Sequence, residues 1–401
     1  LPYIGLEHIG EGSLSLIGTG IAEDVTSLKN RFRQGDILFG KLRPYFRKVV
    51  RATFHGICST DIWVVRPQPG VDAGFLFYLM ASDLFVEPIV RASEGTKMPR
   101  AQWQYACALE LPLPPLPEQR AIAHILGTLD DKIELNRRMS ETLEAMARAL
   151  FKSWFVDFEP VRAKMEGRWK RGQSLPGLPA HLYDLFPDRL VDSRRERIPQ
   201  GWELGTLASV SVLNPEVWTK ATRPTEIHYI DLSNTKWGRI EALTTYSADE
   251  APKRAQRVLR PGDTVVGTVR PGNGSYALVY EPGLTGTTGF AVLRPRSPYY
   301  KEFIYLAATS QQNIDALAHL ADGAAYPAVR PEAVAATPCV VPPDDVLCAF
   351  SRFAGSAFDK VSLTERESRT LAALRDALLP KLISGELRVK DAERFLEERG
   401  L

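Results

Sequence analysis

The sequence repeats itself at long range, and this feature constrains the fold more than any other. The stretch GDILFGKLRP at residues 35–44 returns as GDTVVGTVRP at residues 262–271, and EGTKMP at residues 94–99 returns as DGAAYP at residues 322–327. Two shorter motifs, RPQP and LPP, return as RPRS and VPP with the same shift of 227 or 228 positions. Because a constant shift over a long stretch indicates a duplicated unit, the chain should fold into two similar halves.

Each repeat begins with a head, a segment that mixes strands and helices. Short runs rich in β-branched and aromatic residues, such as DIWVVRP and FAVLRP, stand between Gly and Pro turns, which is typical of β-strands. A helical patch follows at residues 74–90 and again at residues 300–317. We therefore predict an α+β fold with two similar domains, each a mixed β-sheet plus helices, related by a pseudo-two-fold internal repeat.

Each repeat ends in one long helix. Three prolines, Pro114, Pro115 and Pro117, stand before a long stretch without proline, and Glu118 suits the positive end of a helix dipole. Apolar residues follow a heptad pattern in both copies of this stretch, and both seams turn polar in the middle. The predicted seam residues are Ile122, Leu129, Ile133, Asn136, Leu143, Leu150, Phe350, Val361, Thr364, Leu371 and Leu378. We expect an antiparallel coiled coil of helices about 57 Å long that holds the heads apart, with two independent core helices as the alternative.

These patterns divide the chain into six predicted segments. The stretch between the first long helix and the second head is rich in Pro, Gly and charged residues and shows little periodicity, so we take it as a connector. The segments are the first head at 1–115, the first long helix at 116–156, the connector at 157–197, the second head at 198–343, the second long helix at 344–384, and a C-terminal tail at 385–401.

Positive charge gathers at matching places of the two repeats. Residues 29–51 hold eight Lys or Arg and one acid, and residues 253–270 hold five and one, although the net charge of the whole chain is only +2. Such runs are often solvated faces, but two of them at matching positions favour an anion-binding surface. Two basic heads on a spacer suit double-stranded DNA that carries two unlike half-sites with an unread gap between them.

The candidate DNA contacts are cations for phosphates and side chains suited to base edges. In the first head they are Lys41, Arg43, Arg47, Lys48, Lys97 and Arg100. In the second head they are Lys220, Arg223, Arg270, Asn273, Ser275, Tyr276 and Tyr326. The Gly-rich stretch at residues 270–277 would let the backbone approach a groove, and a plain hairpin turn explains it equally well.

What the sequence lacks argues against several other classes of protein. It has no apolar run of membrane-spanning length and no secretory leader. Its four cysteines are widely spaced, which indicates a reducing, cytoplasmic location. Phosphate-loop and methyltransferase motifs are absent, and among possible metal ligands only His55 and Cys58 lie close in sequence. We therefore expect a DNA reader with no catalytic residue and no metal.

The chain resembles the specificity subunits of type I restriction-modification systems. The stretches that carry the resemblance are residues 111–167, LFPD at residues 185–188, IPQGW at residues 198–202 and LLPKLISGEL at residues 378–387. The family's fold is two target recognition domains joined by two helices that form an antiparallel coiled coil. The resemblance implies a non-catalytic subunit that selects double-stranded DNA within a complex.

The resemblance also implies a set of partners. It implies binding to two modification (methyltransferase) subunits and, through them, to restriction (translocase/endonuclease) subunits. S-adenosylmethionine and ATP with Mg are then cofactors of those subunits, and this chain has none of its own. The residues that the resemblance assigns to subunit docking are Pro114, Pro115, Leu116, Pro117, Glu118, Gln119, Arg120, Trp154 and Phe155.

The sequence departs from the family pattern in two places. The second repeat carries a leader from Ile198 to the YIDL motif at Tyr229, whereas the first repeat begins almost at its matching YIGL, so we expect a trimmed or incomplete first head. The second helix begins with VPPDDVLC in place of a second proline–glutamine motif, so we expect weaker or asymmetric docking there. The alternatives are a stand-alone DNA-binding scaffold without enzyme partners and an enzyme fragment whose catalytic domain precedes Leu1.

Overall fold

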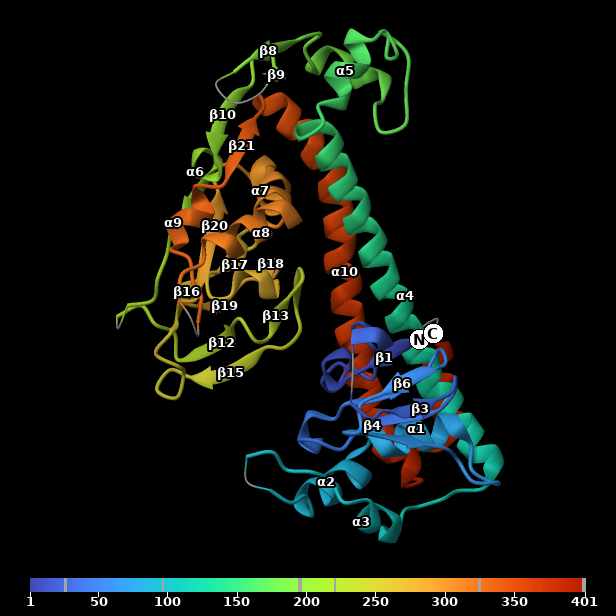
Figure 1. Ribbon diagram of the computed structural model, residues 1–401. Coiled ribbons are helices and arrows are strands. Elements are labelled where there is room, and N and C mark those ends of the chain that lie inside the picture. Colours follow the sequence, from blue (N-terminus) through green and yellow to red (C-terminus); the bar gives the residue numbers. More distant parts are fainter. Residues whose placement is uncertain (25–26, 96, 194–196, 220, 324–325, 399–401) are drawn as a thin grey trace. The chain divides into compact units, whose positions relative to one another are not determined.

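The computed structural model of the chain describes residues 1–24, 27–95, 97–193, 197–219, 221–323 and 326–398. These residues form two compact units (Figure 1). Unit 1 contains the first head and is built from Leu1–Arg138 and Thr364–Leu401, while unit 2 contains the second head and is built from Met139–Leu363. The candidate DNA contact Lys220 lies outside the described residues.

Unit 1 holds two small sheets with helices packed against them. The first sheet has the order β2 (Gly20–Ile21), β1 (Pro2–Ile4), β6 (Gly56–Cys58), β3 (Asn30–Phe32), and the second has the order β5 (Val49–Arg51), β4 (Ile37–Gly40), β7 (Ile62–Val65). The helices of the head are α1 (Ala73–Ala81), α2 (Asp83–Arg91) and α3 (Trp103–Ala108), with short 3-10 turns η1 (Leu6–His8), η2 (Ala22–Asp24) and η3 (Pro44–Phe46). The apolar faces of α1 and α2 are buried in the core of this unit, which follows from their Phe- and Leu-rich sequences.

Unit 2 holds two four-stranded sheets of the same kind. Their orders are β15 (Thr244–Ser247), β12 (Glu226–Ile230), β19 (Leu284–Thr287), β16 (Ala255–Val258), and β11 (Ser211–Leu213), β20 (Phe290–Pro295), β17 (Thr264–Gly267), β18 (Tyr276–Leu278). Three strand pairs complete it: β8 (Leu190–Asp192) with β9 (Arg197–Pro199), β10 (Glu203–Thr206) with β21 (Pro338–Val341), and β13 (Thr235–Lys236) with β14 (Arg239–Ile240). Its shorter helices are α5 (Glu159–Met165), α6 (Leu207–Val210), α7 (Lys301–Ala308), α8 (Gln311–Leu320) and α9 (Pro331–Ala335), with 3-10 turns η4 (Ala180–Leu185), η5 (Pro271–Asn273) and η6 (Pro298–Tyr300).

The two heads share one topology, so the internal repeat predicted from the sequence is confirmed in the strand pairing. In unit 1 the first strand β1 pairs in parallel with β6, and in unit 2 β12 pairs in parallel with β19. In each unit the strand that carries the GD motif lies in the middle of the second sheet: β4 between β5 and β7, and β17 between β18 and β20. Strand β11 adds a further edge beside β20, and the described residues of unit 1 contain no counterpart of it.

Two long helices, α4 (Leu116–Phe155) and α10 (Asp344–Ile383), pack together as the sequence predicts (Figure 1). Within unit 1 Asp130 of α4 contacts Arg375 of α10, and Asn136 contacts Ser368. Positions that advance along α4 therefore meet positions that recede along α10, and the pair is antiparallel. A short last helix, α11 (Val389–Glu397), follows α10.

The predicted seam residues line this helix pair to different depths. Eight of them are buried, namely Ile122, Leu129, Asn136, Phe350, Val361, Thr364, Leu371 and Leu378, and the other three, Ile133, Leu143 and Leu150, are half-buried. At the polar middle of the seam the Asn136 amide donates to Glu367 Oε2 at 2.9 Å and to Ser368 Oγ at 3.3 Å. A buried amide of this kind favours one register because a shifted partner would leave it without its hydrogen bonds.

The connector at 157–197 is more ordered than its sequence suggests. It folds into α5, η4 and the β8–β9 hairpin around the buried indole of Trp169. The Trp169 Nε1 donates to Gln173 O at 2.8 Å, and the ring lies edge-on to Tyr183. Residues without periodicity therefore form a compact cap here, because a few aromatic anchors supply its core.

Among the described residues, no single helix has both the length and the apolar character needed to cross a membrane. Helices α1 and α2 reach those limits of length and composition only when taken together, as a pair bent by 50°.

Candidate DNA interface

The first head presents a strained turn at residues 43–47, which we call the first arginine turn. Arg43 and Arg47 flank η3 and both have left-handed backbone angles, with φ of 52° and 51°. Non-glycine residues rarely adopt such angles, so the surrounding structure must impose them. The contacts that hold the backbone in this conformation are a 2.7 Å hydrogen bond from the Arg43 N–H to Pro99 O and a β-bridge between Leu42 and Arg100.

The second head presents the same turn at residues 270–274, the second arginine turn. Arg270 has φ of 48° and Gly274 has φ of 67°, on either side of η5. The Arg270 backbone N–H donates to Pro327 O at 2.7 Å, and Val269 forms a β-bridge with Ala328. In each head the Arg of the RP motif therefore bonds to the Pro that ends the second repeated motif, EGTKMP in the first head and DGAAYP in the second.

An ion pair on a buried carboxylate supports the strand that leads into each turn. In unit 1 the Arg66 guanidinium donates twice to the Asp36 carboxylate, at 2.7 Å for both bonds. In unit 2 Arg294 donates twice to Asp263, at 2.8 Å for both bonds. In each unit the same carboxylate also accepts a bond from a backbone N–H three residues earlier, at 2.7 Å and 2.8 Å. These bidentate pairs fix one edge of each second sheet.

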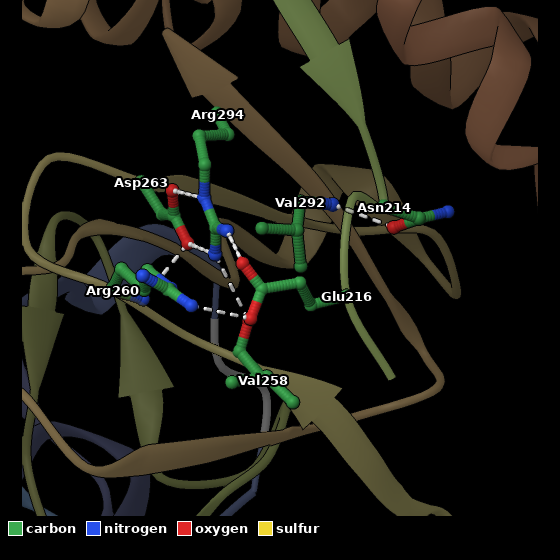
Figure 2. A network of polar contacts seen from close by, with 7 residues as sticks. All are labelled: Asn214, Glu216, Val258, Arg260, Asp263, Val292 and Arg294. Carbon is green, nitrogen blue, oxygen red and sulfur yellow. Dashed lines mark hydrogen bonds and ion pairs between the residues drawn. The ribbon is translucent and has the colours of Figure 1, made fainter. Parts of the chain in front are cut away.

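Unit 2 extends its pair into a larger network (Figure 2). The Arg294 guanidinium lies between the carboxylates of Asp263 and Glu216, and Arg260 reaches Glu216 Oε2 at 2.9 Å. The hydrogen bond from Arg260, with a further one from Arg294, lowers the pKa of the Glu216 carboxyl against the effect of its burial. Asn214 accepts a 3.0 Å bond from Val292 N and so ties the segment of Glu216 to β20.

A second device holds the chain segment that follows the first strand of each head. In unit 1 Lys48 Nζ donates to Leu6 O at 2.8 Å, and in unit 2 Ser275 Oγ donates to Leu232 O at 2.9 Å. Lys236 Nζ in turn donates to Ser275 Oγ at 3.0 Å. Lys48, which is half-buried, and Ser275, which is buried, are therefore tethers of the backbone, although the sequence nominates both as DNA contacts.

The other first-head candidates divide into paired and unpaired cations. Arg47 forms an ion pair with Asp83, and Arg100 Nε lies 3.1 Å from Asp61 Oδ1. Arg43 Nη2 donates to Lys97 O at 3.4 Å, while Arg43 Nε is buried without a hydrogen bond. In the part of the chain that the structure describes, Lys41 and Lys97 have no side-chain partner. The charges most available to phosphate are thus those of Lys41 and Lys97.

The other second-head candidates gather at the second arginine turn with one exception. Asn273 is exposed on it, and the Arg270 guanidinium lies 4.9 Å from the centre of the Tyr326 ring, which is exposed. Tyr276 is buried beneath the turn, where burial raises the pKa of its hydroxyl, so it cannot contact DNA as the sequence suggests. Arg223 is half-buried away from these contacts, with Nε and Nη2 lacking hydrogen bonds among the described residues.

The residues nominated for subunit docking also divide. Five of them, Pro114, Pro115, Leu116, Pro117 and Glu118, are exposed or half-buried at the start of α4, as is Arg120. Gln119 is buried and bonds Asp72 N at 2.8 Å, Pro114 O at 2.8 Å and Gly70 O at 3.3 Å. Trp154 and Phe155 are buried among aromatic side chains such as Phe350. These three side chains are internal contacts of this chain and offer no surface to a partner.

Sequence reasoning missed two exposed aromatic side chains at the arginine turns. Tyr45 lies on the first turn, and Trp237 lies against the second turn from the β13–β14 hairpin. Tyr45 stands inside the basic run and could have been noticed there. Nothing in the sequence signals Trp237, because its approach to Gly274 depends on the tertiary fold.

The described residues contain no cluster of three or more His, Cys, Asp or Glu side chains that could hold a metal ion. Of the pair considered from the sequence, Cys58 is buried, and burial together with the charge of Asp36 raises the pKa of its thiol to about 12. His55 Nδ1 accepts a 3.3 Å bond from Gln34 N. A neutral, buried thiol is a poor metal ligand.

Comparison with known proteins agrees with this geometry. Residues 2–145 match the family of the type I restriction modification DNA specificity domain. Over a longer stretch, the chain is 26% identical to the type I restriction enzyme HindI specificity subunit of Haemophilus influenzae, and the alignment covers 90% of this chain and 88% of that protein. The chain is similar to type I specificity subunits over most of its length, and its residues 2–145 carry their DNA specificity domain.

Further members of the specificity-subunit family show the same likeness. The MjaIX specificity subunit of Methanocaldococcus jannaschii is 23% identical over 82% of this chain and 72% of that protein. Among solved structures, the type I restriction-modification S subunit from M. genitalium is 18% identical and covers 95% of this chain and 88% of that chain, with a TM-score of 0.49. The HsdS subunit from Thermoanaerobacter tengcongensis is 18% identical, covers 96% of this chain and 90% of that chain, and has a TM-score of 0.33.

Proposed function

We propose that this chain is the DNA-recognition subunit of a type I restriction-modification complex, and that it reads a bipartite target of two unlike half-sites with a fixed unread gap. The observation that carries the proposal is the pair of arginine turns. Both are held by the same backbone bond, from Arg43 N to Pro99 O and from Arg270 N to Pro327 O. The side chains between the capping residues differ, RPYFR in one head and RPGNG in the other. One scaffold with unlike side chains suits two readers with different base preferences.

In this proposal the chain selects DNA and leaves the chemistry to its partners. Two modification subunits methylate with S-adenosylmethionine, and restriction subunits translocate and cleave with ATP and Mg. All of them meet the DNA in the cytoplasm. This chain needs no cofactor for recognition, since phosphate contacts and base contacts are made by its own Lys, Arg and Asn side chains.

The start of α4 is the surface we propose for a modification subunit. Pro115, Pro117, Glu118 and Arg120 are exposed there, while the neighbouring Gln119 anchors the helix to the loop at Gly70 and Asp72. The paired variants Glu118→Arg and Arg120→Glu should weaken co-purification of the modification subunit and leave the stability of the isolated chain unchanged. Loss of stability without loss of the partner would contradict this assignment.

The helix pair is proposed to set the unread gap. Inserting one heptad into α4 and one into α10 adds about 10 Å at 1.5 Å per residue, about three base pairs of duplex. A complex with these insertions should methylate a target with the same two half-motifs and a gap about three base pairs longer. An unchanged gap in the mapped methylation sites would exclude the ruler role.

Selection from randomised DNA with this chain and its modification subunit tests the proposal directly. Recovery of two unlike short motifs at a fixed gap would support it. Salt-sensitive binding without any motif would instead support a stand-alone basic scaffold and overturn the proposal. The variant pair Lys41→Ala and Lys97→Ala should weaken binding about equally on all sequences, since phosphate contacts carry no base preference.

A further inference from the structure

The β13–β14 hairpin of the second head breaks a local rule of turn chemistry. Its two loop residues, Trp237 and Gly238, have φ of 47° and 89°, and a two-residue hairpin loop with both angles positive is strongly preferred by Asn-Gly. A bulky aromatic residue pays a strain cost at the first position. A residue whose backbone angles contradict its own conformational preference often marks a functional site.

Just over half of Trp237 (54%) is exposed, and the rest of its side chain packs on Gly274 and edge-on to Tyr276, with 6.1 Å between ring centres. Its backbone is nevertheless fixed: Trp237 N donates to Gly274 O at 2.7 Å, and Gly238 N donates to Tyr276 O at 2.9 Å. One side of the indole lies on Gly274 of the second arginine turn, where a Cβ would come within 2.6 Å of the ring. Position 274 must therefore stay glycine for the indole to occupy this place.

The first head reaches the same arrangement by another route. Its arginine turn carries Tyr45 at the position that corresponds to Gly272, and 47% of Tyr45 is exposed. The Tyr45 ring packs edge-on to Phe46 with 4.7 Å between ring centres. Each arginine turn thus has a half-exposed aromatic ring, supplied by the turn itself in the first head and by the hairpin in the second, where the exposed Tyr326 also lies over Arg270.

The chemistry around the two rings is that of a nucleic-acid surface. Tyr45 stands between Arg43 and Arg47 in the chain, and Trp237 lies on the turn of Arg270 and Asn273. Arg239, two residues beyond Trp237, forms an ion pair with Glu141 of α4 at 3.5 Å. An aromatic side chain beside cations can contact base edges in a groove of duplex DNA, or wedge between base pairs, with little dependence on sequence.

We infer that Tyr45 and Trp237 are the aromatic DNA contacts of the first and second heads, each packing against a base step next to the bases that its arginine turn reads. This inference rests on the proposed function and deepens it. The two rings supply affinity for the half-site and leave the base preference to the polar side chains of the turn. The heads would then share one mode of contact although Tyr45 and Trp237 stand at positions that do not align between the repeats.

Two reciprocal variants test this, and each is the control for the other. In Trp237→Asn the hairpin receives the residue that its loop geometry prefers, so the melting temperature should hold or rise while binding falls. Tyr45→Ala removes the first ring from an exposed site. Tyr299→Ala, which removes an exposed aromatic of unit 2 outside both turns, is the matched control.

The measurement is the affinity of the complex with its modification subunit for duplexes in which one half-site is intact and the other is scrambled. Tyr45→Ala should weaken binding to the first half-site by roughly tenfold to a hundredfold and leave the second unchanged, and Trp237→Asn should do the reverse. The selected motif should stay the same in both variants. An abasic substitution at the contacted step should abolish the difference between wild type and variant.

Three results would overturn the inference. The first is a variant that loses no more affinity for its own half-site than Tyr299→Ala does. The second is an equal loss of affinity for both half-sites in both variants. The third is a loss of affinity that follows the loss of melting temperature. If the wild-type complex selects a bipartite motif and one of these three results is found, the aromatic contacts are rejected and the proposed function stands. If the wild-type complex selects no motif, the proposed function fails first, and this inference falls with it.

Discussion

The Tyr78 hydroxyl donates a 2.7 Å hydrogen bond to Asp130 Oδ2, and the other oxygen of the same carboxylate accepts a 2.6 Å bond from Arg375. This chain of contacts joins α1 to α4 and α4 to α10 within unit 1. Only 3% of the Arg375 side chain is exposed, so Asp130, with 24% of its side chain exposed, is the half-buried counter-charge of a buried cation. The same residues explain why the seam of unit 1 tolerates a guanidinium among leucines.

Removing this counter-charge should destabilise unit 1. Asp130→Ala should lower the free energy of unfolding by about 3 kcal/mol, since it leaves Arg375 with the exposed Asp376 alone. The change should appear in urea unfolding and as faster amide exchange in α1. The control is Asp131→Ala on the exposed face of α4. The double change Asp130→Leu with Arg375→Met should recover most of the loss, and a loss in Asp130→Ala no greater than in the control would contradict the role of the pair.

The Asp36–Arg66 pair should make unit 1 sensitive to acid. Burial alone would raise the pKa of the Asp36 carboxyl, but hydrogen bonds from Arg66 and Arg33 N outweigh it and hold the pKa below its ordinary value. A lowered pKa in the folded state means that the stabilisation is complete above the unfolded pKa of 3.8 and is lost as pH falls through the folded pKa. Asp36→Asn should therefore be less stable than wild type at pH 7, with the difference shrinking below about pH 4. Unfolding free energies at pH 7 and pH 3 check this, and a constant difference would refute it.

Gln119 should matter to folding before any partner is present. Its amide is 1% exposed and bonds Asp72 N, Gly70 O and Pro114 O. Gln119→Ala would leave these groups without partners and should cost about 1–3 kcal/mol of stability in the isolated chain. Glu118→Ala, one residue earlier and exposed, should cost almost nothing. If Gln119→Ala were as stable as wild type but failed to bind a modification subunit, the docking role implied by the family resemblance would be restored.

Glu302 should give unit 2 the opposite dependence on pH. Burial raises the pKa of its carboxyl, although Lys301 Nζ lies 3.3 Å away and Ser351 donates at 2.8 Å. A raised pKa in the folded state means that stability is lost as pH rises from the unfolded value of 4.5 through the folded value. Glu302→Gln should therefore gain stability relative to wild type at pH 7 and gain nothing near pH 4. Thermal unfolding at the two pH values, with the exposed Glu332→Gln as control, measures this, and a loss at pH 7 would show that the charge is needed.

Much of the architecture could be predicted because it depends on periodicity. The shift between the repeats fixes two similar heads, and the heptad pattern with its polar centre fixes the pairing of α4 with α10. Prolines before Glu118 mark the start of α4 because they are tolerated in the first turn. The connector was the exception, since Trp169 builds its core through contacts with Tyr183 and Phe186 that no local pattern reveals.

The candidate site was less predictable, for reasons that are visible at single residues. A cation in the sequence gives no sign of its partner, so Arg47 with Asp83 and Arg100 with Asp61 emerge only in the fold. Whether Lys48 faces solvent depends on the carbonyl of Leu6, which lies far away in the chain. Tyr45 and Trp237 both lie at an arginine turn but stand at positions that do not align, so a comparison of the repeats cannot pair them.

The division of the chain between the units has a consequence during translation. Unit 2 is one continuous stretch, Met139–Leu363, and is complete before the ribosome reaches Thr364. Unit 1 begins with the first residue but needs the second half of α10 to cover the apolar face of α4 at Leu126 and Leu129. The C-terminal half of α10, which is synthesised after unit 2, thus finishes the first head, and this reverses the usual order in which domains fold from the N-terminus. Until then the nascent first head keeps an apolar helix face open to the solvent.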